Sequence, residues 1–193
     1  MPRRPSALHF TEDAAANRLL ARNGFALLVG MLLDQQFPME RAFAGPALVQ
    51  ERLGADLTPA LVMDTDEETL AAVFRGPPAV HRYWGSMAKR TRQLAEVLVT
   101  EYGGDADSLW KTAPDGDELY RRLRALPGYG EAKARIFVGI LGKRMGVRPP
   151  GWDERAADWP SVADVDAFTK VAELREAKKA MKAAAKTGRG AKP

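Results

Sequence analysis

Apolar residues recur at helical spacing along almost the whole chain, and this feature most constrains what the chain can fold into. Alternation of apolar and polar residues over strand length is missing, apart from a short stretch at residues 7–10. The most apolar segment, residues 25–36 (FALLVGMLLDQQ), suits a buried core helix and is shorter than the ~20 residues that cross a membrane. The sequence therefore predicts an all-α protein without a membrane-spanning segment.

Capping residues, glycines and prolines divide the chain into short helices. We expect a break or kink at Gly45-Pro46, because proline interrupts helical hydrogen bonding. The predicted domain covers residues 1–187, a length that suits one ordinary domain or two small helical lobes sharing a core, and residues 188–193 form a disordered basic tail. The expected helices cover residues 11–20, 25–36, 38–52, 67–74, 87–102, 108–112, 117–126 and 131–145, and a last one begins near residue 161 or 164.

Composition excludes several kinds of site. The chain has no cysteine, so it holds no disulfide, no cysteine-ligated zinc and no cysteine-ligated iron-sulfur cluster. With only His9 and His81, histidine-based metal or catalytic sites are poorly supplied, and acid-base chemistry falls to Asp, Glu, Lys or Tyr. We expect no cofactor.

The positive charge is concentrated at the C-terminal end. Residues 175–193 hold seven bases and one acid, Glu176, so that segment carries +6 and the rest of the chain −2. A basic segment of this kind favours polyanions through counterion release, although it is also typical of a solubilising end.

Between the helices predicted at 117–126 and 131–145 lies Leu126-Pro127-Gly128-Tyr129-Gly130. Glycines let a backbone turn sharply and approach another molecule closely. Gly130 directly precedes a helix, whose unpaired amide groups favour an anion such as a DNA phosphate, and Lys133 adds charge in the first turn. The hairpin carbonyls could hold a monovalent cation between protein and DNA. A plain helix-helix connection is the alternative.

The pattern of an apolar residue, Pro-Gly-aromatic-Gly and a helix with Ala134 resembles the helix-hairpin-helix superfamily of base-excision DNA glycosylases. The segment Leu32-Leu33-Asp34-Gln35-Gln36 is similar to the end of an early helix in that family, where two polar residues follow an apolar run. The resemblance covers roughly residues 25–155, with detail in these two patches. The chain also looks like small bacterial glycosylase-like proteins without an iron-sulfur cluster. The resemblance implies a two-lobed helical fold and duplex DNA as the partner.

The resemblance also implies a catalytic aspartate about twenty residues past the hairpin. Asp153 fits best, Asp158 is second and Glu154 third, while the structural alternative is that Asp153 caps a short helix at residues 154–159. A carboxylate there would stabilise the positive charge that develops on the sugar when a base is removed. Trp152, beside Asp153, is the candidate base-pocket residue.

In family members that also cleave the strand, a lysine stands two residues after the second hairpin glycine. Ala132 occupies that position here, so we expect a monofunctional glycosylase without lyase activity, and Lys133 faces phosphate or solvent. Gln35 and Gln36 are expected to fill the gap left by a flipped nucleotide, with a solvated helix end as the alternative.

The sequence thus predicts a monomeric, cytoplasmic, nucleoid-associated glycosylase that removes a damaged or mismatched base from duplex DNA. A non-catalytic DNA-binding module and a helical interaction protein are the competing hypotheses. The base that is removed cannot be read from the chain, because specificity depends on scattered pocket residues.

Overall fold

The computed structural model describes the backbone of residues 4–189 and the side chains of residues 4–185, and this part of the chain contains helices and turns but no strand. The predicted all-α class is confirmed. The helices in chain order are α1 (Ala14–Arg22), α2 (Gly24–Leu33), α3 (Met39–Leu53), α4 (Pro59–Asp64), α5 (Glu67–Arg75), α6 (Trp84–Tyr102), α7 (Ser108–Lys111), α8 (Gly116–Ala125), α9 (Glu131–Lys143), α10 (Trp152–Arg155), the 3-10 turn η1 (Val162–Asp164) and α11 (Lys170–Arg189).

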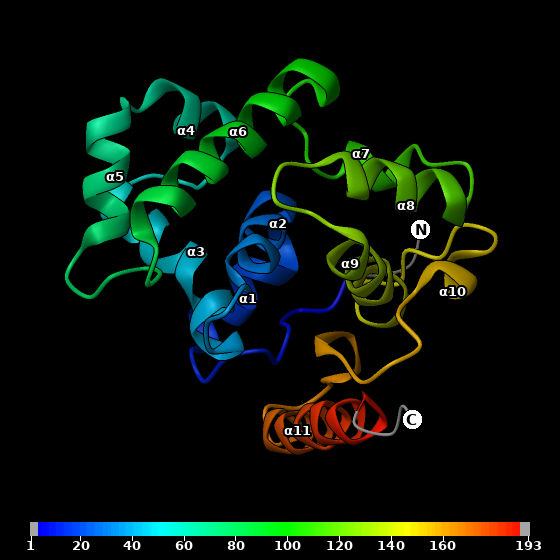
Figure 1. Ribbon diagram of the computed structural model, residues 1–193. Helices are drawn as coiled ribbons and strands as arrows, with labels where there is room; N and C mark the ends of the chain where they lie inside the picture. The colour runs from blue at the N-terminus through cyan, green and yellow to red at the C-terminus, as the bar shows by residue number, and fades with distance from the viewer. Residues whose placement is uncertain (1–3, 190–193) are drawn as a thin grey trace.

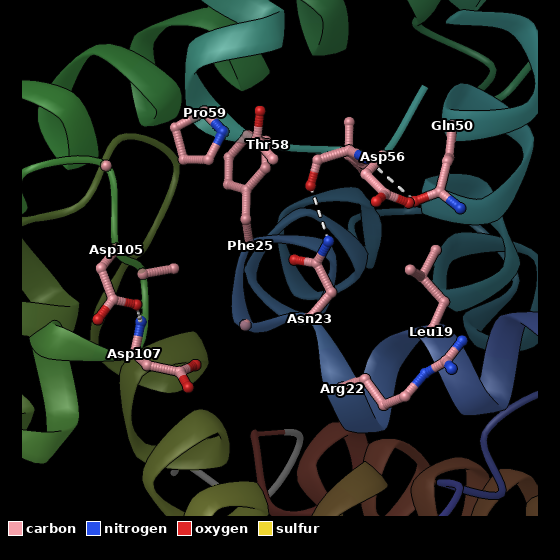
Figure 2. A pocket seen from close by; sticks show the side chains of 14 residues that line it. Leu19, Arg22, Asn23, Phe25, Gln50, Asp56, Thr58, Pro59, Asp105 and Asp107 are labelled. Carbon is pink, nitrogen blue, oxygen red and sulfur yellow. Dashed lines mark hydrogen bonds between the residues drawn. The ribbon is translucent and has the colours of Figure 1, made fainter. Parts of the chain in front are cut away.

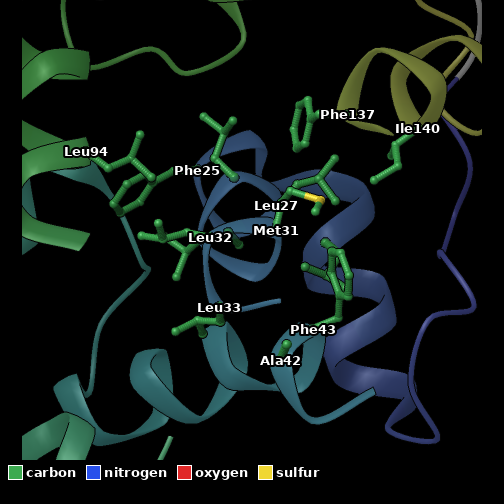
Figure 3. Close-up of a cluster of buried hydrophobic side chains, with 14 of the residues drawn as sticks. Phe25, Leu27, Met31, Leu32, Leu33, Ala42, Phe43, Leu94, Phe137 and Ile140 are labelled. Carbon is green, nitrogen blue, oxygen red and sulfur yellow. The ribbon is translucent and has the colours of Figure 1, made fainter. Parts of the chain in front are cut away.

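Helix α2 lies at the centre of the molecule, and every one of its residues is buried. Its side chains pack against Phe43 of α3, Leu94 of α6, and Phe137 and Ile140 of α9 (Figure 3). A helix that is apolar all round must be covered on every side, which explains why the sequence of α2 shows no polar face.

Apart from α11, the other helices form two groups around α2 (Figure 1). Helices α1 and α3 to α6 lie on one side, with α4 and α5 against α6. Helices α7, α8, α9 and α10 and the turn η1 pack with one another on the other side. Side chains of both groups meet in one hydrophobic core.

Some boundaries differ from the sequence prediction. Helix α3 continues through Gly45-Pro46 without a break, and α4 was not predicted. The last helix begins only at Lys170, because η1 and a turn occupy residues 162–169. Gly188 and Arg189, which we assigned to the tail, are the final residues of α11, and residues 190–193 lie outside the described residues.

Within residues 4–189, no helix has the length and apolar character needed to span a bilayer.

Candidate nucleic-acid site at the hairpin and the end of α2

The turn between α8 and α9 has the geometry that its glycines suggested. Gly128 has a φ of +78°, and the turn is closed by a hydrogen bond from Tyr129 N–H to Leu126 O at 3.0 Å. Gly130 is the N-cap of α9, is exposed, and has no side chain to cap the helix. The first amide groups of α9 are therefore left open to an external acceptor.

Three contacts fix this hairpin on α2. The hydroxyl of Tyr129 donates to Leu28 O at 2.7 Å, and Nζ of Lys133 donates to Leu32 O at 2.7 Å. Gly128 lies so close to Leu32 that a Cβ at residue 128 would overlap its Cδ1. The two sequence patches that carried the resemblance, about a hundred residues apart, therefore lie side by side. Tyr129 is buried, at 5% exposure, so it anchors the hairpin from inside and is not available for stacking on a base.

Lys133 points inward toward the end of α2, not outward to solvent. Burial, with a smaller contribution from the nearby Arg90, lowers the pKa of Lys133 to about 8 against the opposing influence of Asp34. Asp34 is the C-cap of α2 and is half-buried. Burial raises the pKa of Asp34, while Lys178 and Lys133 lower it and Glu40 raises it. A partly buried carboxylate and a partly buried amine thus face the same region beside the hairpin.

Gln35 and Gln36 follow Asp34 in a strained turn. Gln36 is exposed at a φ of +51°, the one residue other than glycine with a positive φ in the described chain. Such a conformation costs on the order of 1 kcal/mol or more and persists only where the surroundings hold it. Arg90 stabilises this turn with a hydrogen bond, in which its Nη1 donates to Oε1 of Gln35 at 3.1 Å.

His81 forms a second hydrogen bond that stabilises this turn. Its Nδ1 accepts the N–H of Tyr83 at 3.0 Å, so the proton of the neutral ring is on Nε2, which donates to Gln35 O at 3.1 Å. His81 is fully buried and its ring packs against Phe37. Burial lowers the pKa of His81, consistent with the neutral form.

The structure does not bring Asp153 and Trp152 to the hairpin. The ring of Trp152 packs on Gly142, near the far end of α9, and Arg155 of the same short helix pairs with Asp117 at the start of α8. Gly142 is twelve residues past Gly130, which corresponds to about 18 Å along a helix. Asp153 itself is exposed within α10, whose N-cap is Gly151 and not Asp153. The predicted roles in catalysis and in a base pocket gain no support from this placement.

The other two candidate carboxylates are also exposed. Glu154 lies beside Asp153 in α10. Asp158 is nearer to the hairpin, because it pairs with Arg135 of α9 at 3.2 Å, but its side chain is 79% exposed. Neither is partly buried as Asp34 is.

A prominent pocket lies at the opposite end of α2 (Figure 2). It has a volume of about 490 Å³, and its lining includes Asp56, Asp105 and Asp107 with one base, Arg22. An acidic lining repels phosphate, so this pocket is not a candidate for contact with the DNA backbone.

Comparisons with known proteins give little further constraint. No family model matches the chain, and no curated protein matches it. Among solved structures, a structure of a trapped covalent intermediate of endonuclease III with DNA, an estranged-adenine complex, is similar at 22% identity and a TM-score of 0.44. The match covers 75% of this chain and 63% of that chain, less than two thirds of its length.

The sequence reasoning missed three residues of this site: Asp34, His81 and Arg90. Asp34 has a signal in the sequence, because it is the first charged residue after the apolar run that forms α2. His81 and Arg90 had no such signal, since they reach the turn from the far side of the Pro77-Pro78 loop and from the middle of α6.

Proposed function

We propose that this chain is a monofunctional base-excision DNA glycosylase that hydrolyses the N-glycosidic bond of a damaged or mismatched base in duplex DNA. The observation that supports it best is the direct contact of the hairpin with the end of α2, which puts Lys133 and Asp34 next to the open N-terminus of α9. An anion site, a partly buried carboxylate and an exposed glutamine then face one region.

In this proposal the hairpin binds the DNA backbone. A phosphate oxygen accepts hydrogen bonds from the first amide groups of α9, where the helix dipole also favours negative charge. Among the hairpin carbonyls of the described chain, those of Leu126 and Gly130 accept backbone N–H groups, whereas no hydrogen bond reaches those of Pro127 and Gly128. Carbonyl oxygens of this kind suit a monovalent cation, which would supply positive charge between the hairpin and the phosphate.

Asp34 takes the catalytic role in this proposal, in place of Asp153. As the base departs, positive charge develops on the deoxyribose, and a carboxylate next to the sugar stabilises it and accepts a proton from the attacking water. Burial raises the pKa of Asp34, and a general base works best when its pKa approaches the working pH.

Lys133 and Gln36 have supporting roles. The ammonium group of Lys133 favours the ionised form of Asp34 and is itself fixed by its hydrogen bond to Leu32 O. Gln36, exposed on its strained turn, would enter the space that the flipped nucleotide vacates. Gln35 is already bound by Arg90 and His81, so it positions Gln36 and does not itself enter the duplex.

One observation favours a second candidate, a DNA-binding module without catalysis. All three carboxylates predicted from the family pattern are exposed. Asp153 lies in α10, whose Trp152 packs on α9 near the end that is far from the hairpin. A chain that had lost its chemistry would keep the hairpin and bind duplex DNA with a strong dependence on salt.

The two candidates are separated by incubating labelled duplexes that carry alkylated, deaminated, oxidised or mismatched bases with excess protein. The glycosylase proposal expects free base and an intact abasic strand from at least one duplex. Tight duplex binding with no base released from any of them would favour the binding module.

A further inference from the structure

The C-terminal helix α11 presents a basic surface whose apolar side is already used. Val171 and Leu174 are 4% and 7% exposed, so they attach the start of the helix to the body of the protein. Met181 is the exposed large apolar residue farther along the helix. What α11 offers to a partner is therefore charge and not an apolar stripe.

The exposed side of α11 carries four bases at helical spacing, which we call the α11 basic face. They are Arg175, Lys178, Lys179 and Lys182, and together with Ala183 they line a shallow hollow. Arg175 is paired with Glu40 of α3. On α11 itself Glu176 approaches Lys179 at 4.0 Å, with both side chains more than three-quarters exposed. A pair this exposed neutralises little, so the face keeps a strong positive potential.

The α11 basic face begins at the candidate site. Arg175 forms an ion pair with Glu40 in the first turn of α3, and Lys178 acts electrostatically on Asp34 at the end of α2. The face therefore begins beside Asp34 and extends away from it through Lys182. A duplex seated with one nucleotide at Asp34 would continue along this direction.

We propose that the α11 basic face binds the sugar-phosphate backbone of duplex DNA next to the nucleotide held at Asp34. The proposal rests on the proposed function, since it takes the same duplex as partner. From Arg175 to Lys182 the helix extends about 10 Å. A DNA strand presents a phosphate about every 3.4 Å of the duplex axis, so the face spans roughly three phosphates.

The test compares two double variants of the full chain with the same loss of charge. Lys179→Gln with Lys182→Gln neutralises the outer part of the face and leaves Arg175 and Lys178 in place. Lys111→Gln with Arg121→Gln removes two exposed bases of α7 and α8, and it is the matched control. Equilibrium binding to an undamaged 20-base-pair duplex is measured over a series of salt concentrations, with binding to anionic phospholipid vesicles in parallel.

We expect the α11 variant to lower the magnitude of the slope of log K against log salt by about two, and to weaken binding roughly 10- to 100-fold near 0.1 M salt. The control should keep the wild-type slope. Base release by the control variant should also match the wild type, because Lys111 and Arg121 lie outside the α11 basic face, the hairpin and the end of α2.

The role of α11 would be overturned if both double variants gave the same slope of log K against log salt. If the wild type still bound duplex and released base, the proposed function would remain. Loss of vesicle binding with unchanged duplex binding would also overturn it. If the wild type bound no duplex at any salt concentration, the proposed function would fail first.

Discussion

The two hairpin glycines should respond differently to alanine. Gly128 has a φ of +78°, a backbone conformation that costs an alanine roughly 1–2 kcal/mol. Its new Cβ would also overlap Cδ1 of Leu32, which is fully buried, adding roughly 1–3 kcal/mol of overpacking. Gly128→Ala should therefore lower the free energy of unfolding by about 2–5 kcal/mol.

Gly130→Ala is the matched control. Gly130 has a φ of −93°, and a Cβ there would meet no atom within 4 Å, so the cost at this N-cap should stay below about 1 kcal/mol. The same Cβ would stand beside the open amides of α9, where we propose that phosphate binds. Gly130→Ala should therefore weaken duplex binding about tenfold or more, a loss of about 1.4 kcal/mol or more.

The assays are urea unfolding followed by circular dichroism, and duplex titration at fixed salt. The reasoning would be refuted if Gly128→Ala were as stable as the wild type. It would equally be refuted if Gly130→Ala bound duplex with wild-type affinity.

Three further predictions concern the residues that hold the site together. Tyr129→Phe removes the buried hydrogen bond to Leu28 O, so urea unfolding should show a free energy of unfolding lower by about 1 kcal/mol. An unchanged midpoint would mean that packing alone fixes the hairpin. The pKa of His81 is lowered below its ordinary value of 6.5, so the stability it contributes is full above pH 6.5 and is lost as the pH falls toward the lowered value. Urea unfolding between pH 7.5 and 5 should show this decline in the wild type and a flatter profile in His81→Gln, and parallel profiles would count against it. Borohydride added during reaction with an abasic duplex should trap no covalent complex, and a complex that disappears in Lys133→Met would show that Lys133, whose pKa is about 8, acts as an amine nucleophile after all.

The fold could be predicted from sequence to a large extent, because each helix carries its own local signals. Asp13, Asn23, Asp66 and Asp115 each accept a backbone N–H at the start of a helix, and capping of this kind depends only on neighbouring residues. The N-terminus of α11 was misplaced, since helical spacing continues through the turn that follows η1 and does not show where the chain changes direction.

The site was predicted only in the part that is contiguous in sequence. The residues that shape the LPGYG turn are adjacent in the sequence, so the turn could be recognised locally. Gln35 and Gln36 stood out as polar residues directly after an apolar run. The catalytic role that we propose for Asp34 has no such local signal. Sequence distance from the hairpin favoured Asp153, which stays a prediction, and the structure packs the neighbouring Trp152 on Gly142 near the far end of α9. The proximity of Asp34 to Lys133 is a tertiary feature that no spacing encodes.

The most direct test of this account is the single-turnover rate of base release by Asp34→Asn and by Asp153→Asn, measured on a duplex that the wild type cleaves. The account predicts that Asp34→Asn loses about 100-fold or more of the rate while it still binds the duplex, and that Asp153→Asn keeps the wild-type rate. The reverse pattern, with Asp34→Asn fully active and Asp153→Asn inactive, would contradict it.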